Sequence, residues 1–94
     1  MLRQTKEKIT GILEKTLKIL SPAKNFEDMN LTAEIKVFLK YSDEENVLKV
    51  AVKRLLPEIS ERMHKDILQN ELTDAEIIIC DIESVQDALF EEGI

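Results

Sequence analysis

Carboxylates are the residues of this sequence with the clearest chemical potential, and they gather at one end of the chain. Residues 71–94 contain eight Asp or Glu and no Lys, Arg or His. The formal net charge of the 94-residue chain is −6, so residues 1–70 sum to +2. We expect seven of these acids to form a negative surface for a protein partner with a basic surface: Asp74, Glu76, Asp81, Glu83, Asp87, Glu91 and Glu92.

Two of these acids stand where they weaken a helix. Glu91 and Glu92 close a helix predicted over residues 85–92, and the helix dipole disfavours negative charge at a C-terminal end. Each costs a few tenths of a kcal/mol there. The two acids are therefore better explained by the negative electrostatic field that they create than by a contribution to folding. Solubility alone is the simpler alternative.

Other catalytic or ligand-binding groups are scarce. His64 is the single histidine, and Cys80 is the single cysteine, predicted to be buried within a strand. Zinc sites take four ligands, mostly Cys and His, and the carboxylates do not follow the spacing of a calcium loop. Two glycines cannot build a phosphate-binding loop. We expect no enzymatic activity, no metal and no cofactor.

Composition also limits the partners and the cellular setting. An acidic chain with few aromatic residues is not typical of proteins that bind nucleic acid directly. The longest apolar run, residues 77–80, is far below the ~18 residues that cross a membrane. A lone cysteine suits a reducing compartment. We expect a cytoplasmic protein, in the host cytoplasm if it is viral, that contacts neither membrane nor nucleic acid.

Periodicity predicts the secondary structure at the two ends of the chain. Apolar residues of 3–20 recur at helical spacing, and Ser21-Pro22 ends that helix. Residues 31–41 alternate between apolar and polar, which is typical of a half-buried strand. Residues 75–82, AEIIICDI, are rich in β-branched side chains and also predict a strand, followed by the helix at 85–92.

The middle of the chain admits two interpretations. Residues 47–54 alternate like a second strand, and Pro57 favours a new helix over 57–70. The alternative is one long helix over 43–70 that replaces the second strand and the second helix. We favour the first interpretation. It gives a single α+β domain over residues 1–94, ordered α-β-β-α-β-α, with a three-stranded sheet.

The predicted sheet has an outward face that could bind a second copy. On it, apolar side chains would form a small patch framed by lysines, which predicts a homodimer. The members of this self-association patch are Lys36, Phe38, Lys40, Lys49, Ala51, Lys53, Ile77 and Ile79.

Two functional hypotheses follow. The first is a non-catalytic, acidic interaction module: a regulator or inhibitor that docks its C-terminal surface on a basic partner, such as a nucleic-acid-binding protein. The alternative is a self-assembling structural subunit of a larger complex, such as a viral one, in which the basic face of one copy meets the acidic end of another.

Overall fold

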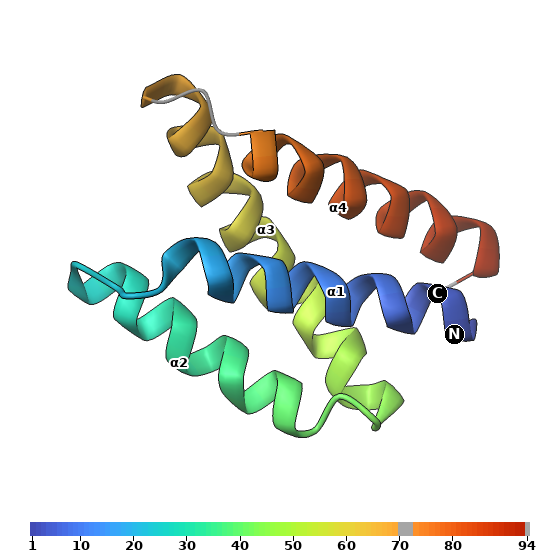
Figure 1. Ribbon diagram of the computed structural model, residues 1–94. Helices are drawn as coiled ribbons and strands as arrows, with labels where there is room; N and C mark the ends of the chain where they lie inside the picture. The colour runs from blue at the N-terminus through green and yellow to red at the C-terminus, as the bar shows by residue number, and fades with distance from the viewer. Residues whose placement is uncertain (70–72, 94) are drawn as a thin grey trace.

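Helices form all the regular structure of the part of the chain that the computed structural model describes, residues 1–69 and 73–93 (Figure 1). They are α1 (Arg3–Leu20), α2 (Phe26–Lys40), α3 (Glu45–Gln69) and α4 (Thr73–Glu92). Within those ranges no residue is in a strand. The predicted α+β fold with a three-stranded sheet is therefore wrong, whereas the helix predicted over 3–20 is confirmed as α1.

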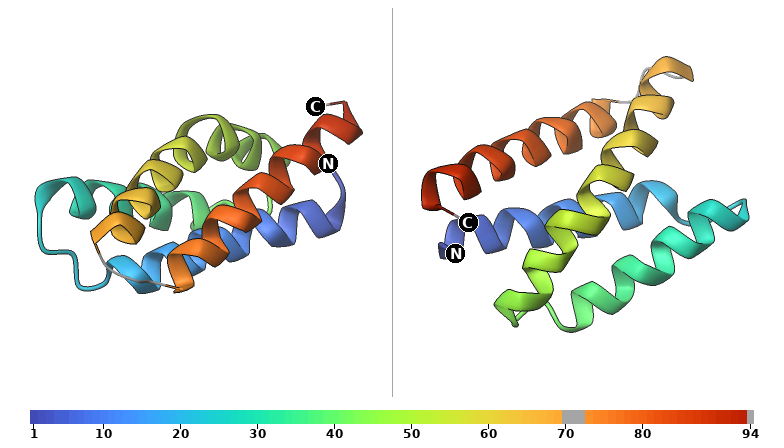
Figure 2. Two further views of the ribbon diagram at one scale, coloured as in Figure 1. Left: turned by 90° about the horizontal axis from the view of Figure 1, so that it is seen from above. Right: turned by 180° about the vertical axis from the view of Figure 1, so that it is seen from behind.

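Helix α1 lies at the centre of the arrangement. Helices α2 and α4 run along opposite sides of α1, and α3 crosses behind it (Figures 1 and 2). Both α1 and α3 contact all three other helices, while α2 and α4 do not touch in the described ranges. The outer faces of α2 and α4 therefore point to different sides of the molecule.

The core is made of aliphatic side chains, one face from each helix. Its largest fully buried members include Ile9 and Leu13 of α1, Leu55 of α3 and Ile78 of α4. Helix α2 contributes the fewest, since only Leu31 and Ile35 of its apolar residues are buried. At about 25 cal/mol per Å² of buried apolar surface, this core is the main source of stability.

The expected strand over 31–41 is part of α2, and its alternation has a different cause. Leu31 and Ile35 are buried, one helical turn apart, while Ala33 and Val37 face solvent on the other side of the same helix. Apolar residues on two faces of a helix produce the same two-residue alternation as one face of a strand. Asn25 caps the N-terminal end of α2, because its side chain accepts a hydrogen bond from the Asp28 N–H at 2.8 Å.

The expected strand at 47–54 and helix at 57–70 form one helix, α3, which continues through Pro57. In this region the long-helix alternative was the better prediction, although Asn70 lies outside the described residues. Proline removes the N–H that would donate to the Lys53 carbonyl. Because Pro57 and Lys53 both lie on the exposed side of α3, water can replace that hydrogen bond.

The expected strand at 75–82 and helix at 85–92 are likewise one helix, α4. Ala75, Ile78, Ile82, Val85 and Leu89 are buried at helical spacing, so the apolar face continues without a break. Burial of this face outweighs the low helix propensity of three consecutive isoleucines, which is a few tenths of a kcal/mol each.

The register of α4 can be tested with two neighbouring isoleucines. Ile78 is fully buried, whereas Ile77 is 48% exposed. Ile78→Ala leaves a cavity and should lower the free energy of unfolding by about 3 kcal/mol. Ile77→Ala is the matched control and should cost less than about 0.5 kcal/mol. Urea unfolding followed by circular dichroism measures both, and equal losses would contradict the helical register.

Candidate functional site

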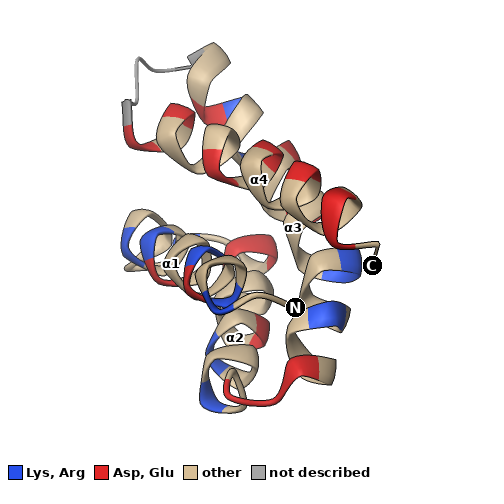
Figure 3. Ribbon diagram, turned by 90° about the vertical axis from the view of Figure 1, so that its right-hand side faces the viewer, with Lys and Arg blue, Asp and Glu red and all other residues tan. Residues whose placement is uncertain are grey.

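The outer face of α4 carries a line of exposed carboxylates. Opposite its buried face lie Glu76, Cys80, Glu83, Asp87 and Glu91, all exposed and separated by three or four residues. Positions with this spacing lie on one side of a helix. Figure 3 shows acidic residues along α4. We call Glu76, Glu83, Asp87 and Glu91 the acidic stripe; at 1.5 Å per residue it spans about 22 Å.

The other three predicted acids turn toward α1 instead. The Asp81 carboxylate accepts from Lys15 Nζ at 3.0 Å. Glu92 accepts from the Leu2 backbone N–H at 2.6 Å and from Thr5 Oγ1 at 2.9 Å, so it ties the end of α4 to the start of α1. Asp74 lines a small cavity with Lys15 and Lys18. The seven acids therefore divide into four on the outer stripe and three on the α1 side.

The charges of the acidic stripe are not neutralised locally. No Lys or Arg in the described ranges forms an ion pair with any of its four members. Lys8 lies at its edge, yet its Nζ donates to Ser84 Oγ at 2.8 Å. Glu83, Asp87 and Glu91 follow one another at i, i+4, a spacing at which like charges destabilise a helix by about 0.2–0.5 kcal/mol per pair.

Cys80 lies within this exposed line and not in the core. The sequence had placed it inside a strand, among buried isoleucines. In α4 its side chain is exposed, and it lines a shallow cavity with Lys8, Glu83 and Asp87. The prediction of a buried thiol is therefore wrong.

The structure does not bring the predicted self-association patch together. Ala51 is fully buried in the core, and Phe38 and Ile79 are partly buried against it. Lys36, Lys40, Lys49, Lys53 and Ile77 are spread over the surfaces of α2, α3 and α4. The prediction grouped those eight residues only because they would share the outward face of a sheet. The structure has helices in these segments, so that shared face does not exist.

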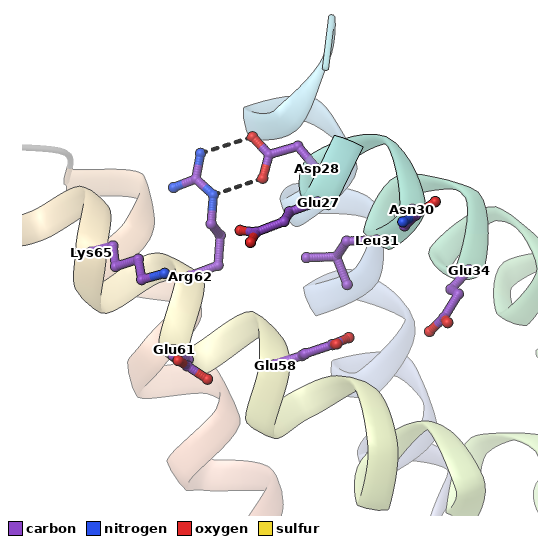
Figure 4. A pocket seen from close by; sticks show the side chains of 9 residues that line it. All are labelled: Glu27, Asp28, Asn30, Leu31, Glu34, Glu58, Glu61, Arg62 and Lys65. Carbon is purple, nitrogen blue, oxygen red and sulfur yellow. Dashed lines mark hydrogen bonds and ion pairs between the residues drawn. The ribbon is translucent and has the colours of Figure 1, made fainter. Parts of the chain in front are cut away.

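A polar cleft of about 360 Å³ lies between α2 and α3 (Figure 4). Leu31 forms the apolar part of its wall, and the remaining lining is polar or charged. The charged members are Glu27, Asp28, Glu34, Glu58, Glu61, Arg62 and Lys65.

Arg62 forms a cluster of hydrogen bonds with two aspartates at this cleft. Its Nε and Nη2 bind the two carboxylate oxygens of Asp28 at 2.8 and 3.0 Å, and its Nη1 binds Asp66 on the next turn of α3. Both aspartates are buried. The hydrogen bonds that Arg62 donates hold the pKa of Asp28 below its usual value, and the same bonds to the Asp28 carboxylate raise the pKa of Arg62. The cluster therefore joins α2 to α3.

The rest of the cleft has less defined chemistry. Glu34 accepts from Arg54 Nη2 at 3.1 Å through one oxygen, while its other oxygen is buried without a hydrogen-bond partner in the described part of the chain. Asp28 and Arg62 are 34 positions apart, and nothing in the sequence pairs them. The one available signal was local, since Asn25 followed by Glu27 and Asp28 is a typical helix start.

His64 and the other residues of metal-binding type in the described ranges do not form a metal site. The His64 ring, exposed on α3, donates from Nδ1 to the Ser60 carbonyl at 2.7 Å. In residues 1–69 and 73–93 no three His, Cys, Asp or Glu side chains gather in a way that could hold a metal ion. None of the helices, over the residues described, is both long and apolar enough for a membrane span.

No family model, curated protein or solved structure matches this chain.

The Arg62 cluster gives a prediction about stability. Arg62→Met removes the cation and leaves Asp28 and Asp66 buried without it. We expect a loss of about 2 kcal/mol in the free energy of unfolding, less than the roughly 3–5 kcal/mol of a fully buried pair, because Arg62 is partly exposed. Arg54→Met is the matched control. It removes an exposed pair with Glu34 and should cost at most about 1 kcal/mol.

The same pair of variants has a pH signature. The pKa of Asp28 is lowered in the folded state, so the stabilisation is present above its ordinary value of 3.8 and is lost as the pH falls below it. The stability difference between the wild type and Arg62→Met should therefore narrow as the solution is acidified through that value. Thermal melts at a series of pH values measure this difference, and a constant difference would contradict the ionic role of Arg62.

Proposed function

We propose that this protein is a non-catalytic interaction module, a regulator or inhibitor that docks the acidic stripe of α4 on a basic surface of another protein. One observation carries the proposal: Glu76, Glu83, Asp87 and Glu91 lie on one exposed helix face, and no Lys or Arg of the described residues forms an ion pair with them. The partner class is a protein with Lys or Arg at its surface, such as one that itself binds nucleic acid.

The cost of the arrangement supports this proposal. A helix gains stability from Glu–Lys pairs at i, i+4 and loses it from like charges at that spacing. Helix α4 has three acids in succession at that spacing and no Lys or Arg at all. Solubility could be obtained by scattering the same charges among lysines, as in α1 and α3, with less repulsion. A concentrated field is better suited to steering a cationic partner.

The remaining expectations are part of the same proposal. A protein partner is favoured over nucleic acid because the stripe would repel phosphate groups. An exposed thiol, Cys80, agrees with a reducing compartment such as the cytoplasm. The alternative, a self-assembling subunit, is better supported by the exposed apolar residues of α2, which form one line, than by Ile77 and Phe90, the exposed large apolar residues of α4.

The test compares two variants of equal net charge. Glu83→Gln/Asp87→Asn/Glu91→Gln neutralises the stripe, and Glu14→Gln/Asp43→Asn/Glu58→Gln neutralises three exposed acids elsewhere. Proteins captured from the native host by the immobilised wild type are identified, and their association rates are measured by stopped flow. We expect the stripe variant to associate about tenfold more slowly and the control to change less than about twofold.

Two further readouts separate steering from damage to the fold. The wild-type association rate should fall as salt is raised, because the Debye length shortens below about 8 Å. The stripe variant should be as stable as the wild type or slightly more so, since like-charge repulsion is removed. An association rate that salt and the stripe substitutions leave unchanged, or that both variants lower equally, would refute the proposal.

A further inference from the structure

A line of exposed apolar side chains runs along the outer face of α2. Phe26 is 82% exposed, Met29 52%, Val37 57% and Tyr41, directly after the helix, 46%. Ala33, also exposed, lies between Met29 and Val37. These five residues stand at i, i+3, i+7, i+11 and i+15, so they share one side of the helix. We call them the α2 stripe.

No other helix of residues 1–69 and 73–93 covers the α2 stripe, whose four largest side chains remain 46–82% exposed. The opposite side of α2 supplies Leu31 and Ile35 to the core, and contacts α1 and α3. With this exposure the stripe is a contiguous apolar patch, and such a patch on a monomer is often functional. The stripe also caused the false strand prediction, and such local conflicts concentrate at functional sites.

We propose that the α2 stripe is a dimer interface in which the α2 helices of two copies pack antiparallel across a two-fold axis. The order of side chains fits this symmetry. Ala33 stands at the centre, with Met29 and Val37 each four positions away, and Phe26 and Tyr41 close the two ends. In an antiparallel pair Met29 meets the partner's Val37, and Phe26 lies opposite the partner's Lys40, beside the partner's Tyr41. At the axis, two alanines let the helices approach closely.

Charges along α2 favour the antiparallel orientation over the parallel one. Exposed Glu27 lies in the first turn, whereas exposed Lys36 and Lys40 lie toward the other end. Antiparallel packing brings the two lysines of one copy to the end that holds the partner's Glu27, and it also opposes the two helix dipoles. Parallel packing would instead place each charged residue beside the identical residue of the partner, so that like charges face each other.

The area indicates how strong the dimer can be. One helix from each copy, with five apolar side chains, makes a small interface, near the ~1,000 Å² lower limit for a specific one. We therefore expect a reversible dimer with a dissociation constant on the order of 10 μM or weaker. The rival occupant, an amphipathic helix of another protein, would not require the symmetric order about Ala33.

Sedimentation equilibrium over about 1–500 μM protein tests the interface, at concentrations that bracket the expected dissociation constant. The wild type should shift from monomer toward dimer. Ala33→Glu sets two carboxylates against each other at the axis and should remain monomeric, with an unchanged thermal melt because the site is exposed. Val50→Glu, at an exposed apolar site on α3, is the matched control and should dimerise like the wild type.

Disulfide trapping in a Cys80→Ser background tests the orientation. Met29→Cys mixed with Val37→Cys should cross-link mainly between the two different variants, since antiparallel packing brings these positions within the Cα separation a disulfide allows. Cross-linking mainly between two copies of the same variant would overturn the antiparallel arrangement. A wild type that stays monomeric throughout, or loss of dimer in Val50→Glu equal to that in Ala33→Glu, would overturn the interface and leave the stripe to another occupant.

Discussion

Every helix of this protein must bury one aliphatic face, and that requirement governs what the other faces can do. Helices α1 and α3 meet it in contact with all three neighbours, whereas α2 and α4 each lie at an outer side of the bundle. All the aromatic residues lie in the described ranges and none is fully buried, although Phe38 packs against the core, so stability comes from many small contacts, such as those of Ile12, Leu56 and Ile78. Two outer faces are left over, and both are unusual. That of α4 is mainly acidic, with Phe90 exposed near its end, and that of α2 is mainly apolar, with Lys36 and Lys40 exposed beside it.

The least anchored helix is α2, because only Leu31 and Ile35 of its apolar residues are buried. Polar bonds supplement this small contact. Asn25 caps the start of the helix, and three residues later Asp28 receives the two-pronged bond from Arg62 of α3. Because two N–H groups of one guanidinium bind the two oxygens of one carboxylate, this contact constrains how α2 can rotate about its axis relative to α3. Rotation is what decides which side chains of α2 face water.

The elements that the sequence predicted well are those in which a single periodicity is present. In α1 the apolar positions follow the helical period alone, and its bounds could be read directly. In α2 a second apolar face produces the alternation typical of a strand. In α3 Pro57 predicts a break, but the helix continues because Pro57 lies on its exposed side. In α4 three consecutive isoleucines locally obscure the helical pattern. The acids of α4 were visible in composition. Only the helical register separates the exposed Glu83 and Asp87 from Asp81 and Glu92, which bond to α1.

The placement of the two unusual faces connects the two proposals. Helices α2 and α4 lie on opposite sides of α1 and do not touch in the described ranges, so contact at one leaves the other accessible (Figure 1). A dimer formed through α2 would present two acidic stripes, related by the two-fold axis. A partner with two basic sites would then bind the second stripe as an intramolecular step, at an effective concentration that raises avidity by about 10²–10⁴ when the geometry allows both contacts. Weak self-association through α2 would thus couple the strength of binding at α4 to the concentration of the protein itself.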